Sequence, residues 1–354
     1  MGLPPDKRRT SISTVSQVIS LQQGMTTMTG FFSFAGLRCI AATVAAFVAL
    51  AGSALAQDYP SQLIKMVVGY APGGNVDFIA RLVANSLSQH YGQSVVIINR
   101  PGAAGALGIR EVRQAEPDGY TLLLAYTNEV ILSPAVKGET VLDGFEPVAF
   151  MGHTPGVLSA GRSVEPNDFP GLLAAAKNGR RFTFGGGPNS PAHVTALWLN
   201  AQADFNFRFI PYGRGTSQIV NDVAGGHLDL FFGGLPASLS FIKAGTLKPL
   251  TLSGTERSEA LPDIPTLQEL GFESLTQWYV LLAPKGTPPE VVKKLRSDIY
   301  AILDTPTVRK EMTAQALKMD FMSGEALAAF LKSEKRKLEA LTVKLGLKAN
   351  QSER

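Results

Sequence analysis

The sequence predicts an α/β protein made of two α/β units with a ligand cleft between them. Apolar runs of strand length alternate with amphipathic stretches of helical spacing along most of the chain. This alternation begins near residue 63 and starts again after Pro155, which predicts two units instead of one. Each half also contains a glycine-rich loop between a strand and a helix. Strands separated by single helices imply parallel crossovers and a sheet covered by helices on both faces.

The first 56 of the 354 residues are predicted to be a leader. An apolar, charge-free run at residues 40–55 follows Arg38 and ends in Ala54-Leu55-Ala56, as a cleavable secretory signal does. We expect cleavage after Ala56, which leaves residues 57–354. Two points stay open: the start codon is Met1, Met25 or Met28, and Lys7-Arg8-Arg9 leaves a twin-arginine signal as the alternative.

The composition of the mature chain excludes several classes of function. The leader carries four basic residues and one acidic residue, so its removal lowers the net charge from +4 to +1. The only cysteine, Cys39, lies in the leader, which excludes a disulfide or a thiolate metal site from the mature chain. The near-neutral charge gives no case for a nucleic-acid partner. No later segment is long and apolar enough to span a membrane. We therefore expect a soluble exported protein, periplasmic where the cell has an outer membrane.

Four strands and two helices are predicted before Pro155. The strands are continuous apolar runs, as in buried parallel sheets, at residues 63–70, 94–100, 120–126 and 146–151. The first helix follows residue 77, and its apolar face comprises Ile79, Leu82, Val83 and Leu87. A short helix follows the glycines of residues 102–108 and stops at residues 116–119, "EPDG".

The second half repeats this pattern. Its predicted strands are residues 156–161, 181–186, 207–212, 228–234, 247–254 and 276–286. Its predicted helices are residues 169–179, 192–203, 217–224, 287–303 and 323–345. Residues 156–161 and 276–282 are predicted to carry the chain between the two lobes. Lobe 1 is then residues 57–157 and 272–354, and lobe 2 is residues 158–271, an arrangement suited to closure around a ligand.

Local signatures of catalysis are missing. The sequence contains no zinc-protease, nucleophile-elbow, P-loop or dinucleotide motif. The four histidines, His90, His153, His193 and His227, lack the spacing of metal ligands. We predict a protein that is not an enzyme and that holds no cofactor or metal, with a catalytic set assembled only in three dimensions as the open alternative.

The stretch "GYAPGGNVD" at residues 69–77 is the first candidate binding loop. Gly73 and Gly74 would expose backbone N–H groups at a helix start, where unsatisfied donors and the helix dipole favour an anion. Asp77 is expected to cap that helix. The alternative is a plain tight turn with a capping aspartate.

Three further loops follow predicted strands, at the edge of an open α/β sheet where ligands bind. Thr127 and Asn128 offer hydrogen bonds after the third strand, and Glu129 either meets a ligand cation or is an acid of a first helical turn. The loop "FGGGPNSPAH" is a second glycine-rich loop between a strand and a helix. Its His193 forms a hydrogen bond either with a ligand or with its own loop. Arg214 either pairs with a carboxylate or is simply exposed. One glycine loop in each lobe suits a small carboxylate bound without chemistry.

The mature chain resembles the extracytoplasmic solute-binding proteins of tripartite tricarboxylate transporters, the Bug family. The similar pieces run nearly end to end: "APGGNVDFIARLVANSL", "GQSVVIINRPGAAGALG", "PDGYTLLLAY", "PYGRG", "LPDIPTLQELGF" and "APKGTPPEVVKKL". The resemblance implies a type II periplasmic-binding-protein fold, a small organic acid as ligand, integral membrane transporter subunits or a sensor kinase as partners, and a monomer. It maps ligand binding onto Tyr70, Ala71, Gly73, Gly74, Asp77, Tyr126, Thr127, Asn128, Gly186, Gly187, Asn189, Ser190, His193, Tyr212 and Arg214.

Several residues depart from the family pattern. Relatives often carry serines at the positions of Gly185 and Gly186, and an Asp-Asn pair at Gly233-Gly234. An additional Gly213 precedes Arg214. These departures predict a roomier, less polar second lobe and a larger, aromatic ligand packed on Tyr70, Tyr126 and Trp278.

Three functions remain open at this point. The first is a binding protein that feeds a carboxylate to a membrane transporter. The second is a ligand-loaded partner of a periplasmic sensor kinase. The third is an exported enzyme that uses the same cleft.

Overall fold

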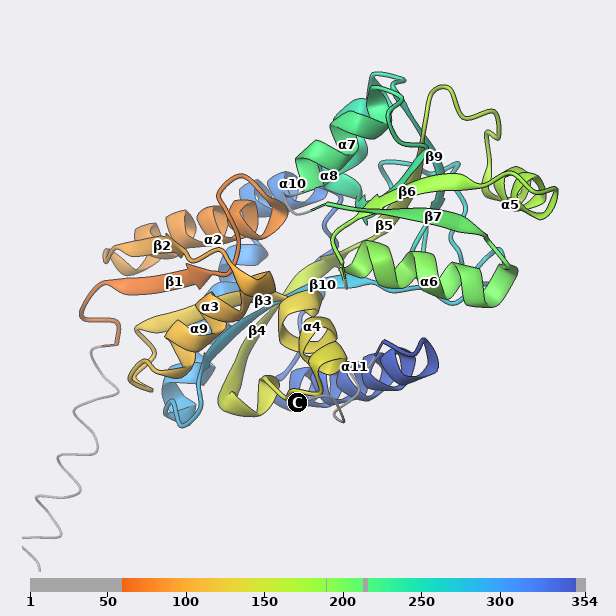
Figure 1. Ribbon diagram of the computed structural model, residues 1–354. Coiled ribbons are helices and arrows are strands. Elements are labelled where there is room, and N and C mark those ends of the chain that lie inside the picture. The colour runs from red at the N-terminus through yellow and green to blue at the C-terminus, as the bar shows by residue number, and fades with distance from the viewer. Residues whose placement is uncertain (1–58, 189, 213–215, 348–354) are drawn as a thin grey trace, which may run out of the picture. The chain divides into compact units, whose positions relative to one another are not determined.

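A computed structural model describes residues 59–188, 190–212 and 216–347 (Figure 1). The predicted leader, its cleavage site and the start codon lie outside the described residues, as do Asn189, Gly213 and Arg214. The described part is a mixed α/β structure with two five-stranded sheets, which confirms the predicted fold class.

Sheet A has the strand order β2-β1-β3-β10-β4. Its strands are β1 (Ile64–Val68), β2 (Val95–Asn99), β3 (Thr121–Tyr126), β4 (Phe145–Thr154) and β10 (Gln277–Pro284). β1 pairs in parallel with β2 and β3, as predicted, because each strand is followed by one crossover helix. β10 runs antiparallel to β3 and β4, which corrects the expectation of parallel crossovers throughout. The chain reaches β10 directly from the second sheet, without a crossover helix.

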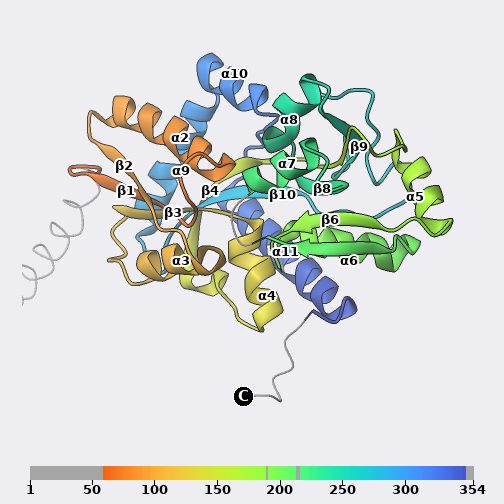
Figure 2. The ribbon, with the colours of Figure 1, turned by 45° about the horizontal axis from the view of Figure 1, so that its top comes forward.

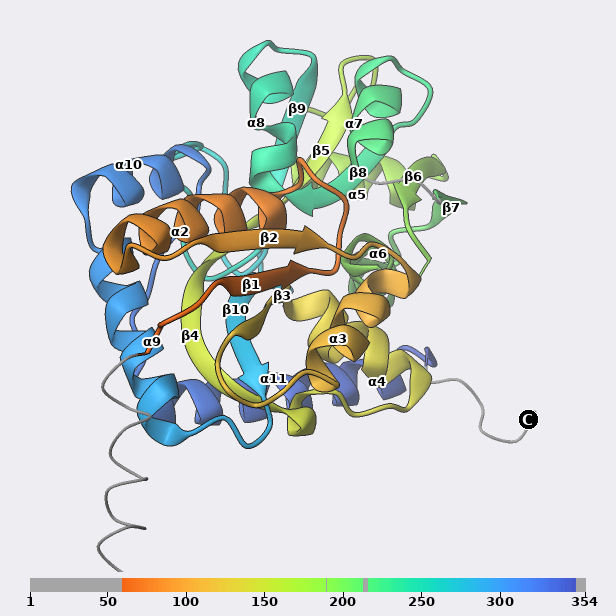
Figure 3. The same ribbon diagram turned by 90° about the vertical axis from the view of Figure 1, so that its left-hand side faces the viewer.

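Helices cover both faces of sheet A, and Figure 3 shows α2 running alongside β2 and β1. One face carries α2 (Asn75–Tyr91), α9 (Pro289–Leu303) and α10 (Pro306–Ala314). The other face carries α3 (Ala106–Arg113), the π-helix η2 (Asn128–Leu132), α4 (Ser133–Lys137) and α11 (Gly324–Lys344). The predicted apolar faces are the buried ones, since Ile79, Val83 and Leu87 of α2 are all fully buried. α4 and α10 were not predicted from the sequence.

Two short 3-10 turns complete this lobe. They are η1 (Ala103–Gly105), which leads into α3, and η3 (Leu142–Gly144), which leads into β4.

Sheet B has the strand order β7-β6-β8-β5-β9. Its strands are β5 (Gly156–Gly161), β6 (Phe182–Gly186), β7 (Phe207–Pro211), β8 (Leu230–Gly234) and β9 (Leu247–Leu252). α5 (Phe169–Lys177) and α6 (Pro191–Ala203) pack on one face, and α7 (Thr216–Ala224) and α8 (Leu235–Lys243) on the other. α8 was not predicted.

The chain changes sheet just outside the two segments predicted to cross. β5 is a full strand of sheet B, paired with β8 and β9, and β10 is a full strand of sheet A. The first change of sheet falls at Pro155, and the second falls between Leu252 and Gln277. A sequence pattern can indicate an extended segment, but its sheet depends on distant partners.

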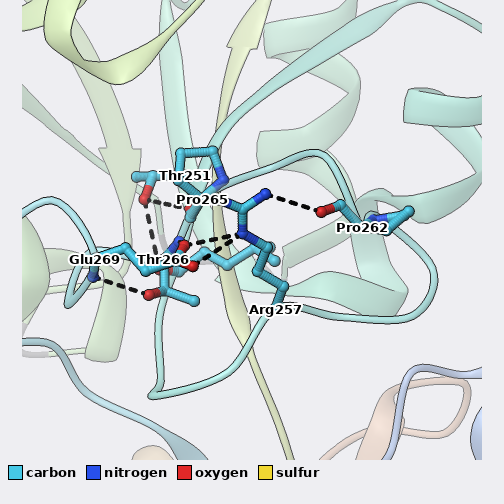
Figure 4. Close-up of polar contacts among 7 residues, drawn as sticks. Thr251, Arg257, Pro262, Pro265, Thr266 and Glu269 are labelled. Atoms are coloured by element: carbon cyan, nitrogen blue, oxygen red, sulfur yellow. Dashed lines mark hydrogen bonds and ion pairs between the residues drawn. The ribbon is translucent and has the colours of Figure 1, made fainter.

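The return segment after β9 is held by a polar network that Figure 4 shows. Thr266 Oγ1 accepts from the Glu269 N–H at 3.1 Å, and Glu269 Oε2 accepts from the Thr266 N–H at 2.8 Å. This reciprocal pair is a capping box. Arg257 Nε donates to both Glu269 oxygens at 3.0 Å, and its Nη1 donates to the Pro262 carbonyl at 3.1 Å. The motif "LPDIPTLQELGF" therefore has a structural role here.

Elements around the two sheets also contact each other outside the connecting segments. Val194 and Trp198 of α6 belong to the same buried cluster as Leu327 and Leu331 of α11 (Figure 2). Lys318, which follows α10, forms an ion pair with Glu256 of the return segment at 2.5 Å. Among the helices of the described residues, none is both long enough and apolar enough to cross a bilayer.

Candidate functional site

The first candidate loop joins β1 to α2, beside the end of the parallel strand β3. Gly73 has a φ of +89°, which favours glycine, whereas Gly74 is extended at φ −88° and stands at the N-cap of α2. A Cβ added at Gly74 would meet nothing within 4 Å. No side chain caps the helix at Gly74, and the first N–H groups of a helix lack acceptors within it. The loop therefore exposes backbone donors next to open space.

Asp77 does not stand at the N-cap, which corrects the expected capping. It is the third residue of α2, and its carboxylate accepts from the Gly73 N–H at 2.9 Å. It also accepts from Arg81 at 2.8 and 3.0 Å and from Asn99 Nδ2 at 2.9 Å. Burial raises the pKa of Asp77, but the bonds from Arg81, Gly73 and Asn99 outweigh it and hold that pKa below its ordinary value. Asp77 thus occupies the Gly73 donor that was expected to meet a ligand.

Three of the predicted residues lie together at the ends of β1 and β3. The rings of Tyr70 and Tyr126 are 5.3 Å apart and edge to face. Asn128 Nδ2 donates to the Tyr70 hydroxyl at 3.4 Å, and the Tyr70 hydroxyl donates to the Ala104 carbonyl at 3.5 Å. Asn128 Oδ1 is buried without a hydrogen-bond partner among the described residues. Parallel neighbouring strands end at one edge, which brings these loops together. Ala71 is exposed in the same turn.

Two other predicted residues serve the core instead. Thr127 Oγ1 accepts from the Trp278 N–H at 3.0 Å and fastens the loop to β10. Trp278 is 1% exposed, packs edge to face on Phe330, and donates from Nε1 to Glu334 of α11 at 3.0 Å. The expectation that Trp278 packs on a ligand is wrong.

Glu129 lies in the first turn of η2 and is 1% exposed. Its Oε1 accepts from the Tyr126 N–H at 3.0 Å, whereas Oε2 has no partner among the described residues. A Cβ at Gly69 or Gly105 would come within 2.4 and 2.2 Å of Oε2, so only glycines fit beside this carboxyl. Burial raises the pKa of Glu129 well above its ordinary value. Of the two interpretations of Glu129, the structure supports the first-turn acid.

The second-lobe glycines are packed more tightly than expected. A Cβ at Gly185 would lie 2.7 Å from both Ile219 Cγ2 and Leu228 Cδ1. A Cβ at Gly186 would lie 3.0 Å from Phe209 Cε2. Apolar side chains occupy the space that serines would fill, so the prediction of extra room at these two positions is wrong.

The loop after β6 is organised around its own helix. Ser190 is the N-cap of α6 and accepts from the His193 N–H at 3.4 Å. The His193 ring stacks on Phe209 at 4.0 Å, and burial lowers the pKa of His193. Gly187 is half-buried and accepts from the Ser190 N–H at 3.1 Å.

Tyr212, at the end of β7, turns its hydroxyl toward Asp222 of α7 at 2.5 Å. Burial and this bond raise the pKa of Tyr212 to about 12. The remaining second-lobe predictions, Asn189 and Arg214, lie outside the described residues.

α2 approaches lobe 2 through residues that were not predicted as site residues. A Cβ at Gly234, the last residue of β8, would lie 3.0 Å from Asn75 Nδ2 and 3.1 Å from Gln277 Oε1. Asn75 opens α2 and Gln277 opens β10. The available signal was a polar residue at the first position of the amphipathic helix α2 and of the apolar strand β10. Within the described ranges, no group of three or more His, Cys, Asp or Glu side chains is placed to hold a metal ion.

Comparisons with known proteins agree with this architecture. Residues 79–347 match the family described as the tripartite tricarboxylate transporter family receptor, TctC. BugT of Bordetella pertussis is 30% identical over 319 residues, which cover 87% of this chain and 97% of BugT. A solved structure of R. palustris Rpa4515 with adipate is 27% identical, with a TM-score of 0.75 over 82% of this chain and 99% of that chain. MatC from Rhodopseudomonas palustris with bound malate is 25% identical, with a TM-score of 0.71 over 80% of this chain and 99% of MatC.

These matches confirm the resemblance and the two-lobed periplasmic-binding-protein fold inferred from the sequence. The chain therefore belongs to the tripartite tricarboxylate transporter receptor family, the TctC or Bug family of periplasmic solute-binding proteins.

Proposed function

We propose that this protein captures a small organic carboxylate in the periplasm and presents it, chemically unchanged, to the membrane subunits of a tripartite transporter. The observation that carries the proposal is the uncapped start of α2 at Gly74, where backbone donors face open space. The related structures that hold adipate and malate support a carboxylate as the ligand class.

In this proposal one ligand carboxylate binds the start of α2. The donors are the N–H groups of Gly74, Asn75 and Val76, since the Gly73 N–H already bonds Asp77. Tyr70, Tyr126 and Asn128 border the same place, and the unpartnered Asn128 Oδ1 can accept from a ligand hydroxyl or amine. Lobe 2 contributes the half-buried backbone of Gly187 and the start of α6.

The domain limits and the export route are part of the proposal. Lobe 1 would be residues 57–157 and 272–354, and lobe 2 residues 158–271. The strand composition of the two sheets supports a discontinuous lobe 1, because β10 rejoins β3 and β4 after β5 to β9 have formed sheet B. It shifts the first boundary to Pro155, since β5 begins at Gly156. Export would use the signal that ends at Ala56.

The first test is thermal unfolding of the mature protein with a panel of mono-, di- and tricarboxylates. A ligand that binds only the native state at 100 times its Kd stabilises it by about 2.7 kcal/mol. Mass spectrometry of ligand released from natively purified protein would identify the acid. If no carboxylate raises the midpoint and no acid is released, the proposal is wrong.

Gly74→Asp tests the location of the site. The extended backbone and empty space at Gly74 accept an aspartate, which would itself cap α2, so the fold should be kept or stabilised. A fixed negative charge there should weaken carboxylate binding by about a hundredfold or more, since a close like charge costs several kcal/mol.

Two controls separate charge from bulk and from net charge. Gly74→Asn has nearly the same shape without the charge and should lose much less affinity. Gln89→Glu adds the same charge at an exposed position in the last turn of α2 and should leave affinity unchanged. Equal affinities for Gly74→Asp and wild type would place the ligand elsewhere.

A further inference from the structure

A cavity of about 410 Å³ lies in lobe 1, on the opposite face of sheet A from α2. Its walls come from η1 and α3 on one side and from η2 and α4 on the other, and Figure 3 shows α3 and α4 beside each other there. Pockets of roughly 300–1,000 Å³ are the usual size for small-molecule ligands. This cavity is therefore large enough for a small metabolite, and its lining includes no residue from the start of α2, although it adjoins Tyr70 through Ala104.

The cavity is lined by an excess of positive charge. Arg110 and Arg113 of α3 and Lys137 of α4 line it, against one exposed carboxylate, Glu139. Among the residues that the structure describes, none of these three cations forms an ion pair, although arginines elsewhere, such as Arg81, do. Arg113 is positioned by close packing on Gly144, where a Cβ would lie 2.7 Å from Nε. Unpaired cations that share one cavity favour an anionic occupant.

The apolar and polar parts of the lining also suit a small anion. Ser133 offers a hydroxyl donor in the cavity wall. Glu129 lines the cavity but is 1% exposed, and its Oε2 lies against Gly69 and Gly105 instead of facing an occupant. Its carboxyl therefore does not offset the positive charge of the exposed cations.

We propose that this cavity is a second binding site, for a small anion that carries two or more negative charges. The two arginines suit bidentate contacts with carboxylate or phosphate oxygens. A neutral or cationic ligand would leave Arg110, Arg113 and Lys137 uncompensated. Polycarboxylates and phosphorylated metabolites share this chemistry, and the experiment separates them.

The test is isothermal titration of the mature protein with citrate and with inorganic pyrophosphate at low ionic strength. The test variant is Arg110→Gln/Arg113→Gln. The matched control is Arg208→Gln/Arg336→Gln, which removes the same charge from two exposed arginines outside the cavity. We expect the test variant to bind at least one polyanion about tenfold or more weakly, and the control to bind within about twofold of wild type. Wild-type affinity should also fall as salt rises. Tighter binding of citrate would identify the ligand as a polycarboxylate, and tighter binding of pyrophosphate would identify it as a phosphorylated compound.

Gly74→Asp separates this site from the one at α2. It should keep polyanion binding in the cavity while losing the carboxylate of the proposed function. If neither probe binds wild type at millimolar concentration, or if both double variants bind alike, the second site does not exist. It is likewise excluded if Gly74→Asp abolishes polyanion binding and Arg110→Gln/Arg113→Gln does not. Lys137→Gln repeats the test should the double variant fail to fold.

Discussion

Replacing Gly185 with serine should destabilise the protein by about 2–6 kcal/mol, although relatives often carry serine at this position. Here the new Cβ would lie 2.7 Å from Ile219 Cγ2 and Leu228 Cδ1, closer than carbon atoms approach without displacement. Overpacking a filled core costs about 1–3 kcal/mol. A buried hydroxyl without an acceptor adds about 1–3 kcal/mol. At about 2–4 °C per kcal/mol, the midpoint of thermal unfolding should then fall by roughly 4–24 °C.

The matched control is Gly187→Ser, two residues further along the chain. Its Cβ would meet nothing closer than Ser190 Cβ at 3.5 Å, and the residue is half-buried. Its effect should stay within about 0.5 kcal/mol. Both variants can be compared with wild type by urea denaturation and thermal unfolding without ligand.

A double-mutant cycle tests the stated cause. Leu228→Ala removes the Cδ1 atom that a serine at Gly185 would strike, so the cost of Gly185→Ser should be smaller in that background. The packing argument is refuted if Gly185→Ser is as stable as Gly187→Ser. It is also refuted if Gly185→Ser costs the same free energy of unfolding with and without Leu228→Ala.

Three further predictions concern Glu129, Asp77 and Ser190. Glu129 has a raised pKa in the folded state, so its contribution to stability is fully present below the unfolded pKa of about 4.3 and is lost as pH rises toward the folded pKa. Wild type should therefore lose stability relative to Glu129→Gln by up to about 1.4 kcal/mol per pH unit, and a difference independent of pH would contradict this. Asp77→Asn should cost about 1–3 kcal/mol in urea denaturation at pH 7 and less in acid, because the depressed pKa of Asp77 means its contribution disappears as pH falls through the folded pKa. Ser190→Ala removes the N-cap of α6 and should cost about 1 kcal/mol, and an unchanged midpoint would show that the cap is dispensable.

Local sequence patterns determined most of the elements and both glycine loops. The apolar run at residues 63–70 contains β1, and the spacing of Ile79, Val83 and Leu87 is the buried face of α2. Pro289 is the first residue of α9 and Ser190 is the N-cap of α6, the positions where their types are favoured. These features follow from the periods of the strand and the helix and from local capping chemistry, which depend on neighbouring residues.

Tertiary structure decided the direction of β10, the partners of the site residues and the space around the glycines. Thr127 Oγ1 accepts from the Trp278 N–H across 151 positions of sequence, which gives this hydroxyl oxygen a partner within the fold. The Asp77 carboxylate accepts from Asn99 of the strand β2, 22 positions away, and also from the Gly73 N–H. Gly185 is closed by Ile219 and Leu228, which no local pattern connects to it. Burial and hydrogen bonding are properties of groups brought together from distant parts of the chain. The sequence alone therefore indicated candidate binding loops, while the fold decided which of their atoms already have a partner within the protein.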